Sequence, residues 1–131
     1  KGKRRAKGRM MIFLDTYAII EIAVQNPNYK PYTLNSEEAI TSVFNLIEIH
    51  FYYLKNFGIE EAEKAYNKVK SIVVPINDMI IKEANSFKLK NLKKRFSFAD
   101  CIGYATARKY NAKFVTGDYM FKGLEDVEFV K

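Results

Sequence analysis

The chain has 131 residues, of which 48% are hydrophobic and 15% aromatic, so it suits one globular domain and is not an intrinsically disordered protein. No apolar run approaches the roughly 18 residues of a membrane span, and the basic start lacks the apolar stretch of a signal peptide, so we expect a soluble protein without membrane contact. The single cysteine, Cys101, suits a cytoplasmic location. One cysteine and one histidine exclude an internal disulfide and argue against a Cys/His zinc site or a histidine-based triad.

The net charge of +7 is concentrated at the N-terminus. Six of the 22 basic residues lie within residues 1–10, and without them 16 basic residues face 15 acidic ones. This arm is either an RNA-binding tail or an expression leader ahead of a natural start at Met10 or Met11, and we expect it to be disordered. Residues 11–131 should then form a single domain.

The first half of the domain predicts one strand and two helices. Residues 9–15 carry a short apolar run that suits a buried strand, and residues 16–24 look helical before a loop with two prolines. From residue 35 to residue 58 the apolar side chains recur at helical spacing, so we expect a long helix that starts near Ser36 and ends at Gly58. Its apolar stripe comprises Ile40, Val43, Phe44, Ile47, Phe51 and Leu54.

The second half continues the alternation of helices and strands. The predicted elements are a helix over 59–71, a β-branched strand over 72–76, a helix over 77–95 that becomes basic towards its end, a helix over 97–111, a strand and turn over 112–118, and a strand over 127–131. This order favours an α/β fold with a central parallel sheet flanked by helices. Right-handed crossovers place the carboxyl ends of such strands on one edge, where ligands normally bind.

Three aspartates are expected at this edge. Asp15 follows the first strand, Asp118 follows the strand that begins at residue 112, and Asp100 lies in the first turn of the helix that starts near Ser97. Each also has a structural explanation. Asp15 suits a helix N-cap, Asp118 suits a turn, and Ser97 with Asp100 has the spacing of a capping box.

A fourth acid, Glu48, lies inside the long helix. Its polar seam of Thr41, Asn45 and Tyr52 is either a solvated face or the wall of a cleft. Several carboxylates at one edge repel one another unless a cation neutralises them. Oxygen ligands suit hard cations, so the convergence predicts a site for Mg²⁺ or Mn²⁺.

Four segments, in this order and spacing, resemble the PIN domain family, and most closely the small toxin ribonucleases of VapBC-type toxin–antitoxin pairs. They are MIFLDTYAII, NLIEIHFYYL, FADCIGYATA and FVTGDYMFKGL. The resemblance implies a PIN-like three-layer sandwich and a site that hydrolyses RNA with one or two Mg²⁺ or Mn²⁺ ions. It also implies a homodimer and a cognate antitoxin. The implied catalytic residues and metal ligands are Asp15, Glu48, Asp100 and Asp118, supported by Thr16, Asn45 and Thr116.

Two positions depart from the family pattern. Tyr17 stands where the family often has Asn, and Met120 stands where it often has a further Asp, although Phe121 keeps the aromatic residue that follows. Because a missing ligand weakens a second metal site, one tightly held ion is as plausible as two. Glu48 is expected either to ligate the metal or to orient the attacking water.

The basic segment before Asp100 is a candidate RNA-binding surface. Its residues Lys90, Lys93, Lys94 and Arg95 either contact RNA phosphates beside the metal or form a solvated helix end that complements the helix dipole.

Three other functions compete with the toxin ribonuclease. The first is a non-catalytic RNA-binding or scaffold protein, which the departures at Tyr17 and Met120 would suit. The second is an RNA-processing nuclease unrelated to toxin–antitoxin systems. The third is a phosphoacceptor signalling domain, which ranks lowest because TGD stands where that class needs a lysine, and because Glu48 would have no role in it.

Overall fold

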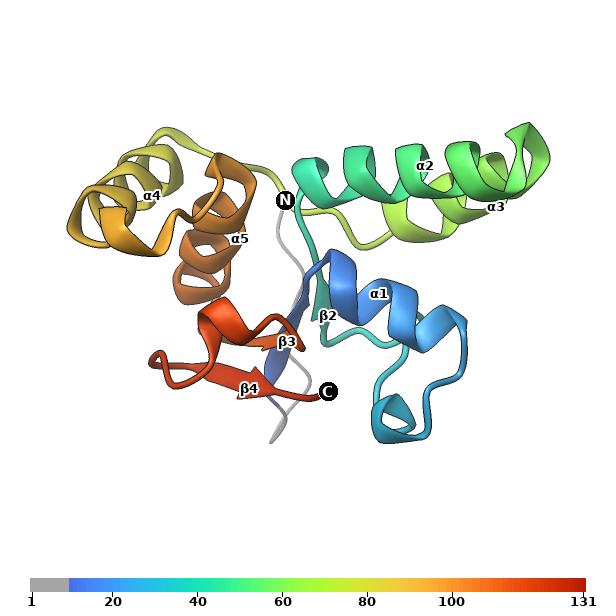
Figure 1. The fold of residues 1–131 in the computed structure, drawn as a ribbon, viewed down its shortest axis with the longest axis horizontal. Coiled ribbons are helices and arrows are strands. Elements are labelled where there is room, and N and C mark those ends of the chain that lie inside the picture. The colour runs from blue at the N-terminus through green and yellow to red at the C-terminus, as the bar shows by residue number, and fades with distance from the viewer. Residues whose placement is uncertain (1–9) are drawn as a thin grey trace.

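The structure is a computed structural model that describes residues 10–131, so the expectations for the basic arm lie outside the described residues except at Met10. Its centre is a parallel sheet of four strands in the order β2-β1-β3-β4 (Figure 1). The strands are β1 (Met11–Leu14), β2 (Ala39–Ile40), β3 (Ala112–Thr116) and β4 (Val127–Phe129). The central pair, β1 and β3, supplies the two aspartates at the carboxyl edge.

Five α-helices connect and cover the strands. They are α1 (Thr16–Ala23), α2 (Val43–Phe57), α3 (Ile59–Lys70), α4 (Asp78–Lys90) and α5 (Phe98–Lys109), with short 3-10 helices at Pro27–Tyr29, Leu92–Lys94 and Tyr119–Phe121. In Figure 1, α2 and α3 lie side by side on the right and α4 and α5 lie side by side on the left. No helix within residues 10–131 has both the length and the hydropathy to cross a bilayer.

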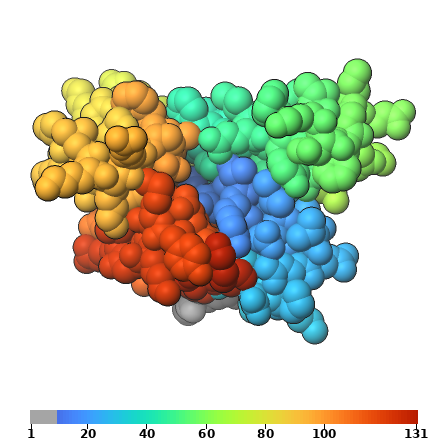
Figure 2. All heavy atoms as spheres, in the orientation of Figure 1, coloured from blue at the N-terminus to red at the C-terminus, as the bar shows by residue number. Residues whose placement is uncertain are grey.

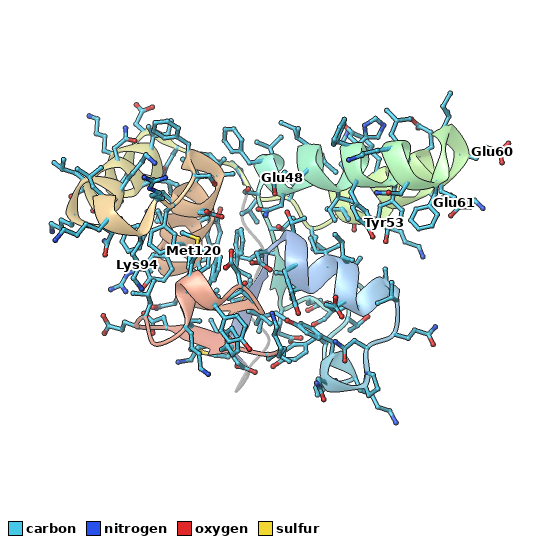
Figure 3. All side chains as sticks on the ribbon, viewed as in Figure 1. Glu48, Tyr53, Glu60, Glu61, Lys94 and Met120 are labelled. Carbon is cyan, nitrogen blue, oxygen red and sulfur yellow. The ribbon has the colours of Figure 1, made fainter. Side chains whose placement is uncertain are left out.

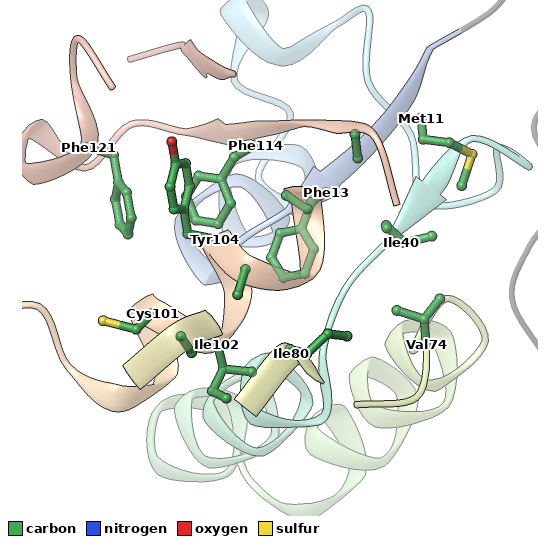
Figure 4. Packing of buried hydrophobic residues seen from close by; sticks show 14 of the residues in the cluster. Met11, Phe13, Ile40, Val74, Ile80, Cys101, Ile102, Tyr104, Phe114 and Phe121 are labelled. Atoms are coloured by element: carbon green, nitrogen blue, oxygen red, sulfur yellow. The ribbon is translucent and has the colours of Figure 1, made fainter. Parts of the chain in front are cut away.

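Two hydrophobic cores, one on each face of the sheet, make the molecule a three-layer sandwich. Alternate side chains of a strand point to opposite faces. Phe13 and Phe114 accordingly stack at 5.3 Å and pack with Tyr104 of α5 (Figure 4). Leu14 and Val115, their neighbours along the two strands, pack in the other core with side chains of α1, α2 and α3. The predicted PIN-like α/β sandwich is confirmed.

The predicted start of the long helix near Ser36 is wrong. Ala39 and Ile40 are fully buried and form β2, and the helix begins only at Val43. The Ser42 hydroxyl is the N-cap and accepts from the amides of Phe44 and Asn45. The physical reason is tertiary, because pairing with β1 satisfies the backbone of this segment in a way that helical spacing does not reveal.

The predicted strand over 72–76 is also wrong. Ile72 and Val74 are buried as their apolar character suggests, but the segment forms a single isolated bridge, between Thr41 and Val73. Pro75 lacks a backbone donor and so shortens the stretch that could pair. The predicted helix over 77–95 likewise ends early, at Lys90, and is followed by the 3-10 helix at Leu92–Lys94.

Candidate active site

A cleft of about 430 Å³ opens at the carboxyl edge of the sheet, where β1 and β3 end. All four acids named above line it: Asp15, Glu48, Asp100 and Asp118. They come from the end of β1, the middle of α2, the start of α5 and the turn after β3. In Figure 2 the cleft lies between the orange and red segments on one side and the teal start of α2 on the other, with blue atoms between them.

Asp15 is held by both neighbouring elements. It is the N-cap of α1, and its Oδ1 accepts from the Ala18 amide at 2.9 Å. Its Oδ2 accepts from the hydroxyl of Thr116, the last residue of β3. The N-cap explanation is therefore correct, and it does not compete with a role in the cleft. The cap and the Thr116 hydroxyl fix the carboxylate where the two central strands end.

The pKa of Asp15 responds both to burial and to the neighbouring acids. Burial raises the pKa of Asp15 from 3.8 to about 7, against the hydrogen bonds from Thr116 and Ala18, which lower it. The negative charges of Asp118 and Asp100 raise it further. A carboxylate in these surroundings is costly to ionise unless a cation accompanies it.

Asp100 and Asp118 also use one oxygen each for local structure. Asp100 Oδ2 accepts from the Ser97 amide at 2.9 Å, and the Ser97 hydroxyl accepts from the Asp100 amide at 3.0 Å, so the predicted capping box is present. Asp118 Oδ1 accepts from the Met120 amide at 3.0 Å. Within residues 10–131 the second oxygen of each carboxylate accepts no hydrogen bond. Capping therefore orients both groups and leaves each an oxygen for a ligand.

Glu48 ends a chain of polar side chains that ties α1 to α2. The Ser42 hydroxyl donates to Asn45 Oδ1 at 2.7 Å, and Asn45 Nδ2 donates to Thr16 Oγ1 at 3.1 Å. Thr16 Oγ1 in turn donates to Glu48 Oε1 at 2.5 Å (Glu48 is labelled in Figure 3). The predicted supporting residues Thr16, Asn45 and Thr116 thus contact the acids directly or through one partner.

The donor set suits a hard divalent cation. Its atoms are carboxylate, hydroxyl and amide oxygens, which are the ligands of Mg²⁺ and Mn²⁺. Across the described residues, no three acids lie close enough together to form a complete metal-binding site by themselves. Tyr17 and Met120, the departures from the family pattern, both line the cleft, and the Met120 side chain offers no oxygen. Such a site fits an ion that takes few protein ligands and keeps waters for the rest.

The basic segment does not gather at the cleft. Lys90 lines a separate cleft between α4 and α5. Lys94 Nζ donates to the Met120 carbonyl at 3.3 Å and so reaches the turn that carries Asp118 (Figure 3). Lys93 and Arg95 are exposed and do not line the cleft. Of the four predicted RNA-binding residues, only Lys94 approaches the acids through a direct contact of this kind.

Two lining residues with polar or charged side chains, Tyr119 and Lys131, were not singled out by sequence reasoning. Tyr119 is adjacent to Asp118, so its position along the chain could have identified it. Lys131 lies outside the four segments that carry the acids of the site, and no motif marks it. It reaches the cleft because β4 pairs with β3 and ends at the same edge. Only the strand order could reveal this lysine.

Solved structures of other proteins share this fold. VapC20 of Mycobacterium tuberculosis, a sarcin–ricin loop cleaving toxin, has 22% identity and a TM-score of 0.66, and the match covers 89% of this chain and 98% of that one. VapBC2 from Rickettsia felis, bound to a DNA fragment from its promoter, has 17% identity and a TM-score of 0.72, with 93% and 100% covered. A toxin–antitoxin complex from Klebsiella pneumoniae has 16% identity and a TM-score of 0.69, with 89% and 95% covered.

Sequence comparison assigns the family. No curated protein matches the chain closely enough to count as a relative. Residues 12–127 match the profile of the PIN domain, and this range includes β2, β3, nearly all of β1 and all four acids. The chain therefore belongs to the PIN domain family.

Proposed function

We propose that this protein is a Mg²⁺- or Mn²⁺-dependent endoribonuclease and the toxin of a toxin–antitoxin pair. The observation that carries the proposal is that Asp15, Glu48, Asp100 and Asp118 line one cleft although they come from four separate segments. Membership in the PIN family and the toxin folds that it matches support the same function. The RNA substrate puts the reaction in the cytoplasm, where the Cys101 thiol also stays reduced.

The four acids have two roles in this proposal, which are to bind the metal ion and to orient the attacking water. Asp15, Asp100 and Asp118 would hold one or two ions, which polarise the phosphate and lower the pKa of bound water. Thr116 and the Ala18 amide orient Asp15, and the capping box orients Asp100. Glu48, with one oxygen held by Thr16, either ligates the ion or orients the attacking water through its other oxygen.

The partners are RNA, a cognate antitoxin and a second copy of the chain. The Klebsiella protein forms a toxin–antitoxin complex, which supports an antitoxin here. The apolar stripe of α2 supports the homodimer, because Phe44, Ile47 and Phe51 expose 38%, 57% and 62% of their surface. A run of exposed bulky side chains on one helix face is typical of an interface, and a self-complementary face gives a symmetric dimer.

Cleavage of a panel of structured and single-stranded RNAs tests the proposal. The wild-type protein is incubated with Mg²⁺, Mn²⁺ or EDTA and compared with Asp15→Asn, which keeps the Oδ1 acceptor for the Ala18 amide. We expect cleavage with either metal, none in EDTA, and none in the variant although it stays folded. Full activity in Asp15→Asn would remove that residue from the mechanism.

One observation favours a second candidate, a non-catalytic RNA-binding protein. Met120 lines the cleft where a further acid is common in the family, so the site has one oxygen ligand fewer. In the same assay this candidate predicts folded protein that binds the RNAs but cuts none of them with any metal. An RNA-processing nuclease would instead cut RNA and lack a cognate antitoxin that inhibits it.

A further inference from the structure

Lys131 places a positive charge at the wall of the acidic cleft. Its Nζ donates to the Gly117 carbonyl at 3.0 Å and lies 5.0 Å and 4.4 Å from the ring centres of Tyr17 and Tyr119. Among the described residues that line the cleft, it is the only one with a basic side chain. Gly117 immediately precedes Asp118, so the ammonium lies beside the turn that carries an acid of the site.

The main chain fixes the point from which this side chain starts. The Val130 amide donates to the Thr116 carbonyl at 2.8 Å, which continues the pairing of β4 with β3. The Lys131 carbonyl accepts from the side-chain amides of Asn26 and Asn28 at 3.3 Å and 3.1 Å. A lysine anchored in this way gives up less conformational freedom when it binds a ligand.

The ammonium keeps donors available. Lysine has three N–H donors, and the Gly117 carbonyl takes one of them. Within residues 10–131 no carboxylate lies within 4.0 Å of Lys131 Nζ, unlike Lys64, Arg108 and Lys113, which are paired with acids. No described carboxylate therefore forms an ion pair with this ammonium.

The two tyrosines shape the wall that holds the lysine. A Cβ added to Gly117 would lie 2.2 Å from Tyr17 Cε1 and 2.7 Å from the Val130 carbonyl oxygen, so only glycine admits both the ring and the backbone that follows β4. Tyr119 is 62% exposed at the mouth of the cleft. Both rings present their π-electrons to the cation, which holds an ammonium without cancelling its charge.

We propose that Lys131 is a phosphate-binding residue for the RNA backbone next to the scissile bond, positioned by Tyr17 and Tyr119. This inference rests on the proposed function and deepens it by assigning the substrate contact. An RNA strand that enters a cleft lined by four carboxylates meets repulsion, and an unpaired cation on the wall offsets it. The contact reads the phosphodiester and not the base, so it is independent of RNA sequence.

Binding of a single-stranded RNA oligonucleotide to the full chain in EDTA tests the inference without cleavage. Lys131→Met removes the charge but keeps an unbranched apolar side chain, and Lys131→Arg keeps the charge. Lys70→Met is the matched control, because Lys70 Nζ lies 5.8 Å from the Tyr66 ring and does not line the cleft. Affinities are measured by fluorescence anisotropy over a series of salt concentrations, and thermal unfolding checks that each variant is folded.

We expect Lys131→Met to weaken binding by about fivefold, the effect of an exposed ion pair. The slope of log affinity against log salt should fall by about 0.7, the value for one phosphate contact on a single strand. Lys131→Arg should retain the wild-type slope, and Lys70→Met should leave it unchanged. An unchanged slope in Lys131→Met, or an equal loss in Lys70→Met, overturns the inference.

Cleavage by the wild-type protein, measured in parallel with Mg²⁺ or Mn²⁺, separates the two proposals. If the wild type cleaves RNA but the Lys131→Met slope is unchanged, the ribonuclease assignment stands and the phosphate contact is wrong. If the slope depends on Lys131 but no metal supports cleavage, the contact stands and the catalytic assignment falls.

Discussion

The acidic cleft and the basic segment at 90–95 differ in how the fold arranges their charged side chains. The four acids are separated by tens of residues in sequence but line one cleft. The four basic residues are neighbours in sequence, yet Lys90 lines another cleft and only Lys94 contacts the turn beside Asp118. Parallel strand pairing brings distant strand ends together, whereas a short 3-10 turn spreads adjacent side chains in different directions. Charge density along a sequence is therefore a poor guide to charge density in space.

The largest expected effect is a loss of RNA cleavage in variants of Asp100, which has one role in the metal site and another in the capping box. Asp100→Asn keeps a cap acceptor but removes the charge, and we expect RNA cleavage to fall by at least about 100-fold, as for loss of a metal-site group. Ser97→Ala breaks the capping box yet keeps the acid, so it should lower the free energy of unfolding by about 1 kcal/mol and leave cleavage largely intact. Cleavage rates and denaturant unfolding check both variants. Equal activity losses in the two would show that Asp100 acts only through the cap.

The next largest effect is the reduction of cleavage when the hydroxyl of Thr16 or Thr116 is removed. Thr16→Val removes the donor to Glu48, and Thr116→Val removes the donor to Asp15, so each should reduce cleavage by roughly 10-fold to 100-fold. Thr106→Val is the matched control, because its buried hydroxyl donates to the Ile102 carbonyl within α5 at 2.7 Å. That variant should alter stability alone. A similar loss of activity in the control would mean that the cleft responds to packing and not to these hydrogen bonds.

A pH dependence follows from the raised pKa of Asp15. Between the ordinary value of 3.8 and the folded value of about 7, the folded state holds a proton that the unfolded chain has lost. The free energy of unfolding of the metal-free protein should therefore fall as pH rises through this window and level off above it. Thermal unfolding in EDTA measures this slope, which Asp15→Asn should largely remove. Excess Mg²⁺ should restore stability to the wild type at high pH, because the cation favours the ionised carboxylate. An equal slope in wild type and variant contradicts the assignment of the pH dependence to Asp15.

The smallest effect tests the basic segment. Lys94→Met should reduce the salt slope of RNA binding by about 0.7 and the affinity by no more than about fivefold, because one exposed phosphate contact is lost. Lys93→Met is its control, since Lys93 is adjacent in sequence but makes no described contact with the turn beside Asp118. Anisotropy titrations in EDTA measure both. Equal slopes for both variants and the wild type would assign the whole segment to a solvated helix end.

Local sequence signals predicted much of the site. The apolar run before Asp15, the helix that starts near Ser97 and the capping box of Ser97 with Asp100 are short-range patterns, and the structure has each of them. The acids were predicted to meet because parallel strands share a carboxyl edge. The same reasoning could not find Lys131, whose position depends on the pairing of β4 with β3. Nor could it predict that the apolar stripe of α2 stays exposed, since periodicity identifies a face but not what covers it.

The sequence by itself determined the strands that precede Asp15 and Asp118, the caps at Asp15 and Ser97 and the residue types of the cleft, because these depend on backbone preferences and on neighbours within a few residues. Tertiary structure alone decided three further points. It made a strand of Ala39 and Ile40, left 72–76 with one bridge, and brought Lys131 beside Gly117. Each of these depends on which distant segment supplies the partner for a backbone or side-chain group, and that free energy is absent until the chain has folded.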